Sequence, residues 1–217
     1  MRDEDSNQFL KELGVENKNI YVTADPVFTL ESTEEEKISE ILKKEGILED
    51  KPLVGVAVRN WKNAEELVDN VAKAIDYLIE EYNTNVILIP MHYPEDLSIS
   101  NNILEKVTKQ RCYILRNKYS VEDIMGVIKR LEIIIAMRLH SLIYAATQGI
   151  PMIGIVYDPK IEGFLKSINM EYMCPVEHIE YNQLISNIEY VWENRDKLRN
   201  KLIELDEEMR TEALKNV

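Results

Sequence analysis

The stretch from Leu131 to Lys160 constrains the fold of this chain most, because it contains two buried strands separated by one short helix. Leu131–Ala136 (LEIIIA) and Met152–Val156 (MIGIV) are short, apolar and rich in isoleucine, which is typical of parallel strands buried on both faces. Ser141–Thr147 predicts a helix between them, and a following glycine and proline end it. This order of elements predicts strands of one parallel sheet.

The same alternation of strand-like and helix-like segments covers most of the 217 residues. Further strands are expected at Leu53–Val58, Val86–Pro90, Cys112–Leu115 and Glu171–Cys174. Further helices are expected at Asp5–Leu13, Ser32–Glu45, Ala64–Tyr82, Ile99–Lys109, Val121–Arg130, Ile161–Ile168 and, as one or two helices, Tyr181–Lys215. Strands that are each followed by a helix predict an α/β fold, a Rossmann-like doubly wound parallel sheet.

Three regions are expected along the chain. Residues 1–30 do not follow the alternation, and we interpret them as a connector from an N-terminal lobe that this sequence lacks. Residues 31–178 form the predicted Rossmann-like domain, which would bind the donor, and residues 179–217 form a C-terminal helical segment.

Composition and short motifs exclude several classes of function. A net charge of −13 argues against nucleic-acid binding, and no apolar run is long enough to span a bilayer. The two cysteines, Cys112 and Cys174, lack metal-like spacing and are expected to be reduced thiols of a cytoplasmic protein. No metal site is expected from three scattered histidines, and the glycine-rich loops of dinucleotide and NTP sites are absent, so no cofactor is predicted.

Cationic and titratable residues follow the predicted strands. Arg138 and His140 lie where a strand leads into a helix, and Lys160 lies just past the next strand. Arg59 and His92 follow two earlier strands. Ligands of open α/β sheets bind at the carboxyl ends of the strands, so these residues predict a site for an anion that carries phosphate.

Several of these residues also have a simpler structural explanation. Arg138 could be the salt-bridge partner of a neighbouring carboxylate, and Lys160 a solvated lysine at a helix start. Asp96 and Asp158 are expected to cap the helices that follow them. Trp61 is more often a packing residue than a platform for a sugar ring.

Motifs in a fixed order along the chain also resemble those of a known family. They are RDEDS at Arg2–Ser6, LKELGV at Leu10–Val15, ADPVF at Ala24–Phe28, GVAVRNW at Gly55–Trp61, PMHYPED at Pro90–Asp96, RLH at Arg138–His140 and YDPK at Tyr157–Lys160. Together they resemble the polysaccharide pyruvyl transferases, and the CsaB type most closely, over about Met1 to Phe164. The resemblance implies the C-terminal lobe of a two-lobed, GT-B-like transferase, with the missing N-terminal lobe as a partner.

The resemblance also implies a reaction. An enolpyruvyl unit would pass from phosphoenolpyruvate to a sugar, expected to be N-acetylmannosamine of a lipid-linked cell-wall precursor in S-layer anchoring, and form a 4,6-linked pyruvate ketal. The lipid would bring the enzyme close to a membrane. His140 would carry the proton, because histidine is the residue type best suited to both giving and taking a proton in such a reaction. Arg138 and Lys160 would bind phosphate and carboxylate, and the resemblance adds Arg2.

Two other functions remain open at this point. A nucleotide-sugar glycosyltransferase of the same architecture would use the same strand ends for a pyrophosphate. The scarcity of glycine in the loops between strands and helices favours the smaller donor, phosphoenolpyruvate. Alternatively, the chain is a non-catalytic half that binds the donor without turnover.

Overall fold

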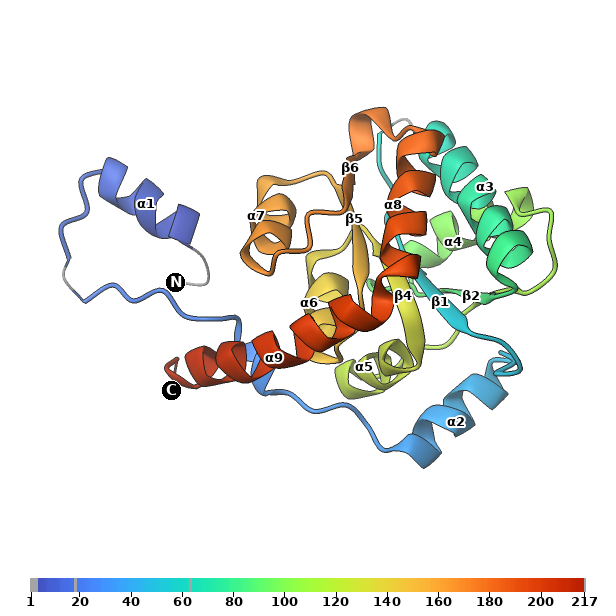
Figure 1. Ribbon diagram of the computed structural model, residues 1–217, viewed down its shortest axis with the longest axis horizontal. Coiled ribbons are helices and arrows are strands. Elements are labelled where there is room, and N and C mark those ends of the chain that lie inside the picture. The colour runs from blue at the N-terminus through green and yellow to red at the C-terminus, as the bar shows by residue number, and fades with distance from the viewer. Residues whose placement is uncertain (1–3, 18, 63, 217) are drawn as a thin grey trace.

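A parallel sheet forms the centre of the protein in the computed structural model, which describes residues 4–17, 19–62 and 64–216 (Figure 1). Its strands are β1 (Leu53–Ala57), β2 (Asn85–Leu88), β3 (Cys112–Ile114), β4 (Leu131–Ala136), β5 (Met152–Val156) and β6 (Met173–Pro175). Neighbouring strands all pair in parallel, in the order β3-β2-β1-β4-β5-β6. The predicted Rossmann-like α/β class is therefore confirmed.

Helices cover both faces of the sheet (Figure 1). They are α1 (Glu4–Glu12), α2 (Glu35–Lys44), α3 (Ala64–Tyr82), α4 (Asp96–Lys106), α5 (Val121–Lys129), α6 (Leu139–Thr147), α7 (Pro159–Ser167), α8 (Tyr181–Glu193) and α9 (Arg195–Leu214), with 3-10 turns η1 (Pro26–Thr29) and η2 (Val176–His178). On one face α3 packs against α4 and α8. On the other, α6 packs against α5, α7 and α9, and α2 packs against α5. No described helix combines the length and apolarity that crossing a bilayer requires.

The strands and the helices that cover them together supply the core. Every residue of β1 and β2 is buried, as expected of strands covered on both faces. Gly154 in β5 allows a close approach by α7, because a Cβ atom at this position would lie only 2.3 Å from Leu165 Cδ1. The α6 helix ends at Thr147, and Gly149 just beyond its C-cap has a φ of +67°, in the left-handed region that favours glycine.

Three helices begin earlier than the sequence predicted. They are α4, α6 and α7, which start at Asp96, Leu139 and Pro159. As a result His140 and Lys160 lie inside the first turns of helices rather than in the loops before them. First-turn residues are often polar and carry no apolar periodicity, so the pattern of the sequence conceals them.

The C-terminal end of α2 is joined to the loop after β3 by one carboxylate. Glu45 accepts hydrogen bonds from the backbone N–H groups of Arg116 and Asn117 at 2.9 and 3.1 Å, and from Tyr119 Oη at 2.6 Å. Burial alone would raise the pKa of Glu45, but these hydrogen bonds outweigh it and hold the pKa below its ordinary value of 4.5.

The segment before the sheet meets the end of the last helix. Figure 1 shows α1 set apart from the sheet and α9 running out toward the N-terminal segment. Asn216 accepts a hydrogen bond from Thr23 Oγ1 at 2.7 Å and donates one to the Ala24 carbonyl at 2.9 Å. The 3-10 turn η1, which lies between Ala24 and α2 in the sequence, packs on α9 and α6. The connection of residues 1–30 to a further lobe stays a prediction.

Candidate functional site

The order of the strands reverses between β1 and β4, which are neighbours at the centre of the sheet. In open α/β sheets, ligands bind outside the carboxyl ends of the strands at such a point. Ala57 of β1 pairs with Ala136 of β4, and the Met137 N–H donates to the Ala57 carbonyl at 2.8 Å. Arg59 and Arg138 each follow one of these alanines by two residues, so they lie on the two sides of the reversal.

Arg138 forms a two-point ion pair with a buried carboxylate. Its Nε donates to Asp96 Oδ2 at 3.0 Å, and its Nη2 donates to Asp96 Oδ1 at 2.6 Å. The Asp96 side chain is only 2% exposed and that of Arg138 is 22% exposed. Asp96 Oδ2 also accepts the backbone N–H of His92 at 2.9 Å. The prediction that Asp96 caps its helix is therefore wrong: the N-cap residue of α4 is Glu95, no side chain caps this helix, and the Asp96 carboxylate joins two loops instead.

The N-terminus of α6 is open. Arg138 is its N-cap residue, and no side chain caps this helix. The first N–H groups of a helix have no acceptor within the helix, so those of Leu139 and His140 face outward with the positive end of the helix dipole. The exposed His140 side chain lies in this first turn, with its ring centroid 6.0 Å from that of Tyr144.

The N-terminus of α7 differs, because a carboxylate already occupies it. Asp158 Oδ1 accepts the backbone N–H of Lys160 at 3.0 Å, which confirms the predicted cap. Asp158 Oδ2 also lies 3.6 Å from Lys160 Nζ, and the lysine side chain is 55% exposed. An anion meets weaker positive charge here than at α6.

Arg59 is held by an aromatic side chain. Its Nη1 donates to Tyr157 Oη at 3.4 Å, and its Cζ lies 5.1 Å from the centroid of the Tyr157 ring. The ring of Trp61 packs on the same tyrosine at 5.1 Å between centroids. Arg59 Nε is buried without a hydrogen-bond partner, and no carboxylate among the described residues pairs with Arg59. Its charge is thus less neutralised than those of Arg138 and Lys160.

The contact between Arg59 and Tyr157 joins loops that are not adjacent. Arg59 follows β1 and Tyr157 follows β5, and β4 lies between these strands. The two side chains therefore reach across the carboxyl end of β4. The sequence placed Tyr157 in the YDPK motif but gave it no role, since the motif itself contains no sign of a partner 98 residues away.

The two remaining predicted residues lie at or beyond the edge of this group. His92 follows β2, and its exposed ring has Nδ1 3.5 Å from Glu95 Oε2. Arg2 lies outside the described residues. The structure thus places Arg59, Arg138 and His140 just after β1 and β4, the two strands of the reversal, and places His92 and Lys160 one strand further out on either side, after β2 and β5.

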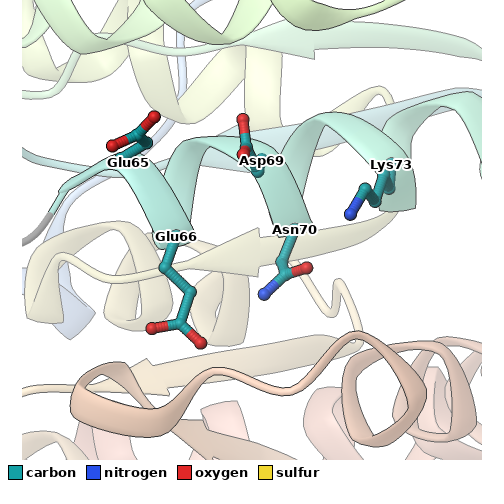
Figure 2. A pocket seen from close by; sticks show the side chains of 5 residues that line it. All are labelled: Glu65, Glu66, Asp69, Asn70 and Lys73. Carbon is teal, nitrogen blue, oxygen red and sulfur yellow. The ribbon is translucent and has the colours of Figure 1, made fainter.

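A hollow of about 590 Å³ elsewhere on the rim has the opposite charge (Figure 2). It is lined by α3 residues, namely Glu65, Glu66, Asp69, Asn70 and Lys73. Asn70 reaches across to donate to the Ile179 carbonyl at 2.7 Å. The three carboxylates that line this hollow oppose binding of an anion, so the strand reversal is the better candidate for an anionic ligand.

The comparison with known families decides the family. A profile described as polysaccharide pyruvyl transferase matches residues 1–159, which is well over half of the chain and includes every residue discussed at the strand reversal except Lys160. The chain belongs to this family. The resemblance noted in the sequence is thereby confirmed. Among curated proteins, none matches the sequence.

Solved structures share the fold of this pyruvyl transferase family member at low sequence identity. The UDP complex of MnaA from S. aureus has a TM-score of 0.68 at 14% identity, over 93% of this chain and 52% of its own. UDP-GlcNAc 2-epimerase from Methanocaldococcus jannaschii has a TM-score of 0.65 at 15% identity, over 88% and 54%. WaaG, a glycosyltransferase involved in lipopolysaccharide biosynthesis, has 0.64 at 14% identity, over 100% and 60%.

The similarity covers only part of each of these structures. This chain spans about half to three fifths of each of them. At such low identity the likeness concerns the fold, and it confirms the expected GT-B-like, Rossmann-like architecture.

Proposed function

We propose that this member of the pyruvyl transferase family binds phosphoenolpyruvate at the strand reversal and uses it to form a pyruvate ketal on a sugar. The observation that carries the proposal is the open N-terminus of α6, which has Arg138 at its N-cap and His140 in its first turn. A helix N-terminus without a capping side chain favours phosphate, and an adjacent imidazole suits proton transfer.

Each charge of the donor has a partner in this proposal. The phosphate lies at the backbone N–H groups of Leu139 and His140 and on the Nη1–Nη2 edge of Arg138, which Asp96 leaves open. The carboxylate lies on Arg59, whose charge has no acidic partner among the described residues. Lys160 contributes from the outer side, and its effect is reduced by Asp158.

His140 moves protons in the proposed reaction. As an imidazolium it gives a proton to C3 of the enol, which becomes the methyl group, while a sugar hydroxyl oxygen bonds to C2. The imidazole then accepts the proton of that hydroxyl. The C2–O bond to phosphate breaks, the second hydroxyl adds to C2, and its proton leaves with inorganic phosphate. The product is a cyclic 4,6-linked ketal.

The acceptor in this proposal comes from the family resemblance. It is N-acetylmannosamine of a lipid-linked precursor of a cell-wall polysaccharide of the kind that anchors S-layers. This chain spans only 52–54% of two of the structures with the same fold, so complete transfer is proposed for a protein that also supplies the remainder of such a fold.

The test separates donor binding from turnover. Calorimetric titration of this chain with phosphoenolpyruvate should show one site, with weaker binding of pyruvate and of inorganic phosphate. Pyruvate incorporation into the glycan should be low with this chain and clear with a protein extended at its N-terminus. In that extended protein, His140→Ala should lower turnover by about 10²–10⁴-fold and leave donor affinity nearly unchanged. Loss of donor binding with near-normal turnover at saturation would show that His140 is only a phosphate ligand.

A nucleotide-sugar transferase is the second candidate, and the UDP complex with the same fold is the observation that favours it. The discriminating measurement is a titration with UDP under the same conditions. Binding of UDP without binding of phosphoenolpyruvate would replace the first proposal with this one. Phosphoenolpyruvate binding without transfer by the extended protein would indicate a non-catalytic binding half.

A further inference from the structure

A carboxylate that is almost completely buried lies beside the proposed anion site. Asp96, in the first turn of α4, is 2% exposed, although it carries a charge that an anionic donor would avoid. The hydrogen bonds that its carboxylate accepts from described residues all come from the rim loops: two come from Arg138 and one from the His92 N–H. The Asp96 carboxylate would repel an anionic ligand, so its presence beside the site needs an explanation other than direct binding of that ligand.

The geometry of the pair supplies this reason. Asp96 binds the Nε–Nη2 edge of the guanidinium, at 3.0 and 2.6 Å. The other edge, formed by Nη1 and Nη2, bonds to no other side chain of the described residues. Because the guanidinium is planar and rigid, fixing one edge also fixes the direction of the other.

We propose that Asp96 is a positioning residue, which holds Arg138 so that its Nη1–Nη2 edge presents two parallel donors to the donor phosphate. The proposal rests on the proposed function and extends it to a residue that does not touch the ligand. Arginine side chains lose considerable rotamer freedom when they bind, and a partner that restricts the side chain beforehand removes part of that cost.

Two effects of Asp96 on donor affinity have opposite signs. Its negative charge alone repels phosphoenolpyruvate, so a purely electrostatic role predicts tighter binding when the charge is removed. Positioning predicts weaker binding, because Arg138 becomes free to leave the phosphate-binding orientation. The sign of the change therefore separates the two roles.

The experiment is a double-mutant cycle on phosphoenolpyruvate affinity by calorimetry. Asp96→Asn keeps the size of the side chain but cannot accept from both guanidinium nitrogens without placing its own N–H₂ group against the arginine. It should weaken donor binding by about tenfold, and Arg138→Gln by about 10- to 100-fold. In the Arg138→Gln background, Asp96→Asn should no longer weaken binding and should strengthen it, since only the repulsion remains to be removed.

Asp123→Asn is the matched control. Asp123 is also a carboxylate in a first helical turn, 8% exposed, with a lysine partner at 2.7 Å, but Lys37 is not one of the rim residues. The Asp123→Asn substitution should lower the thermal stability of the protein without changing its affinity for phosphoenolpyruvate.

Three results would count against the inference. Unchanged or tighter binding by Asp96→Asn alone overturns it, and so does a tenfold loss that persists in the Arg138→Gln background. No binding by the unsubstituted chain refutes the proposed function and with it the positioning role.

Discussion

Arg59 should contribute more to donor affinity than Lys160, although the sequence alone favours the lysine. The structure gives Arg59 no acidic partner among the described residues and buries its Nε, whereas Lys160 is 55% exposed and lies 3.6 Å from Asp158. A charge-assisted hydrogen bond to a carboxylate contributes about 1.5–3 kcal/mol, so Arg59→Ala should raise the Kd for phosphoenolpyruvate by about 10- to 150-fold. An exposed, already paired ammonium contributes about 0–1 kcal/mol, so Lys160→Ala should raise it at most about fivefold.

Calorimetric titration at one ionic strength measures both values, and thermal denaturation verifies that each variant folds. Arg59→Lys should give an intermediate loss, because it keeps the charge but not the two-point geometry. Tyr157→Phe should change the Kd by less than about threefold, since the ring remains and only a 3.4 Å hydrogen bond is lost. An equal or larger loss for Lys160→Ala would refute the reasoning that neighbouring carboxylates rank these cations.

Three further predictions concern stability and thiol chemistry. The pKa of Glu45 is held below 4.5 in the folded state, so its hydrogen bonds stabilise the fold above that pH, and this stabilisation is lost as the pH falls through the folded pKa. Glu45→Gln should therefore lower the free energy of unfolding by about 1–2 kcal/mol at pH 7 and by less in acid, measured by urea unfolding. Gly154→Ala should destabilise by about 1–3 kcal/mol in the same assay, because the added methyl group overlaps α7. Burial raises the pKa of Cys112 to about 12 and of Cys174 to about 11, so alkylation at pH 8 should need denaturant; fast labelling of the native protein would contradict this.

Local patterns predicted the sheet well. The bounds of β4, β5 and α3 coincide with those expected from runs of apolar residues and from helical periodicity. The starts of α4, α6 and α7 lie earlier than predicted, since apolar periodicity begins only after their first turns, whereas α2 starts later, at Glu35 rather than Ser32. The candidate site residues that follow strands also lie at the carboxyl ends of those strands, as predicted.

The partners of these residues were beyond the reach of the sequence. Arg138 meets a carboxylate 42 residues earlier in the chain, and Arg59 meets Tyr157, 98 residues later. Such pairs depend on strand order and helix packing, and one sequence contains no local signal for either. The sequence therefore named the cations of the candidate site, while the structure was needed to show which of them lack an acidic partner among the described residues.

The hydrogen bonds between Asn216 and the Thr23–Ala24 segment mean that the chain enters and leaves this domain at one corner. A short peptide could join the two there, an arrangement that favours circular permutation. The closeness of these two segments also matters for the design of fusion proteins. A fusion attached after α9 will emerge beside the Thr23–Ala24 segment.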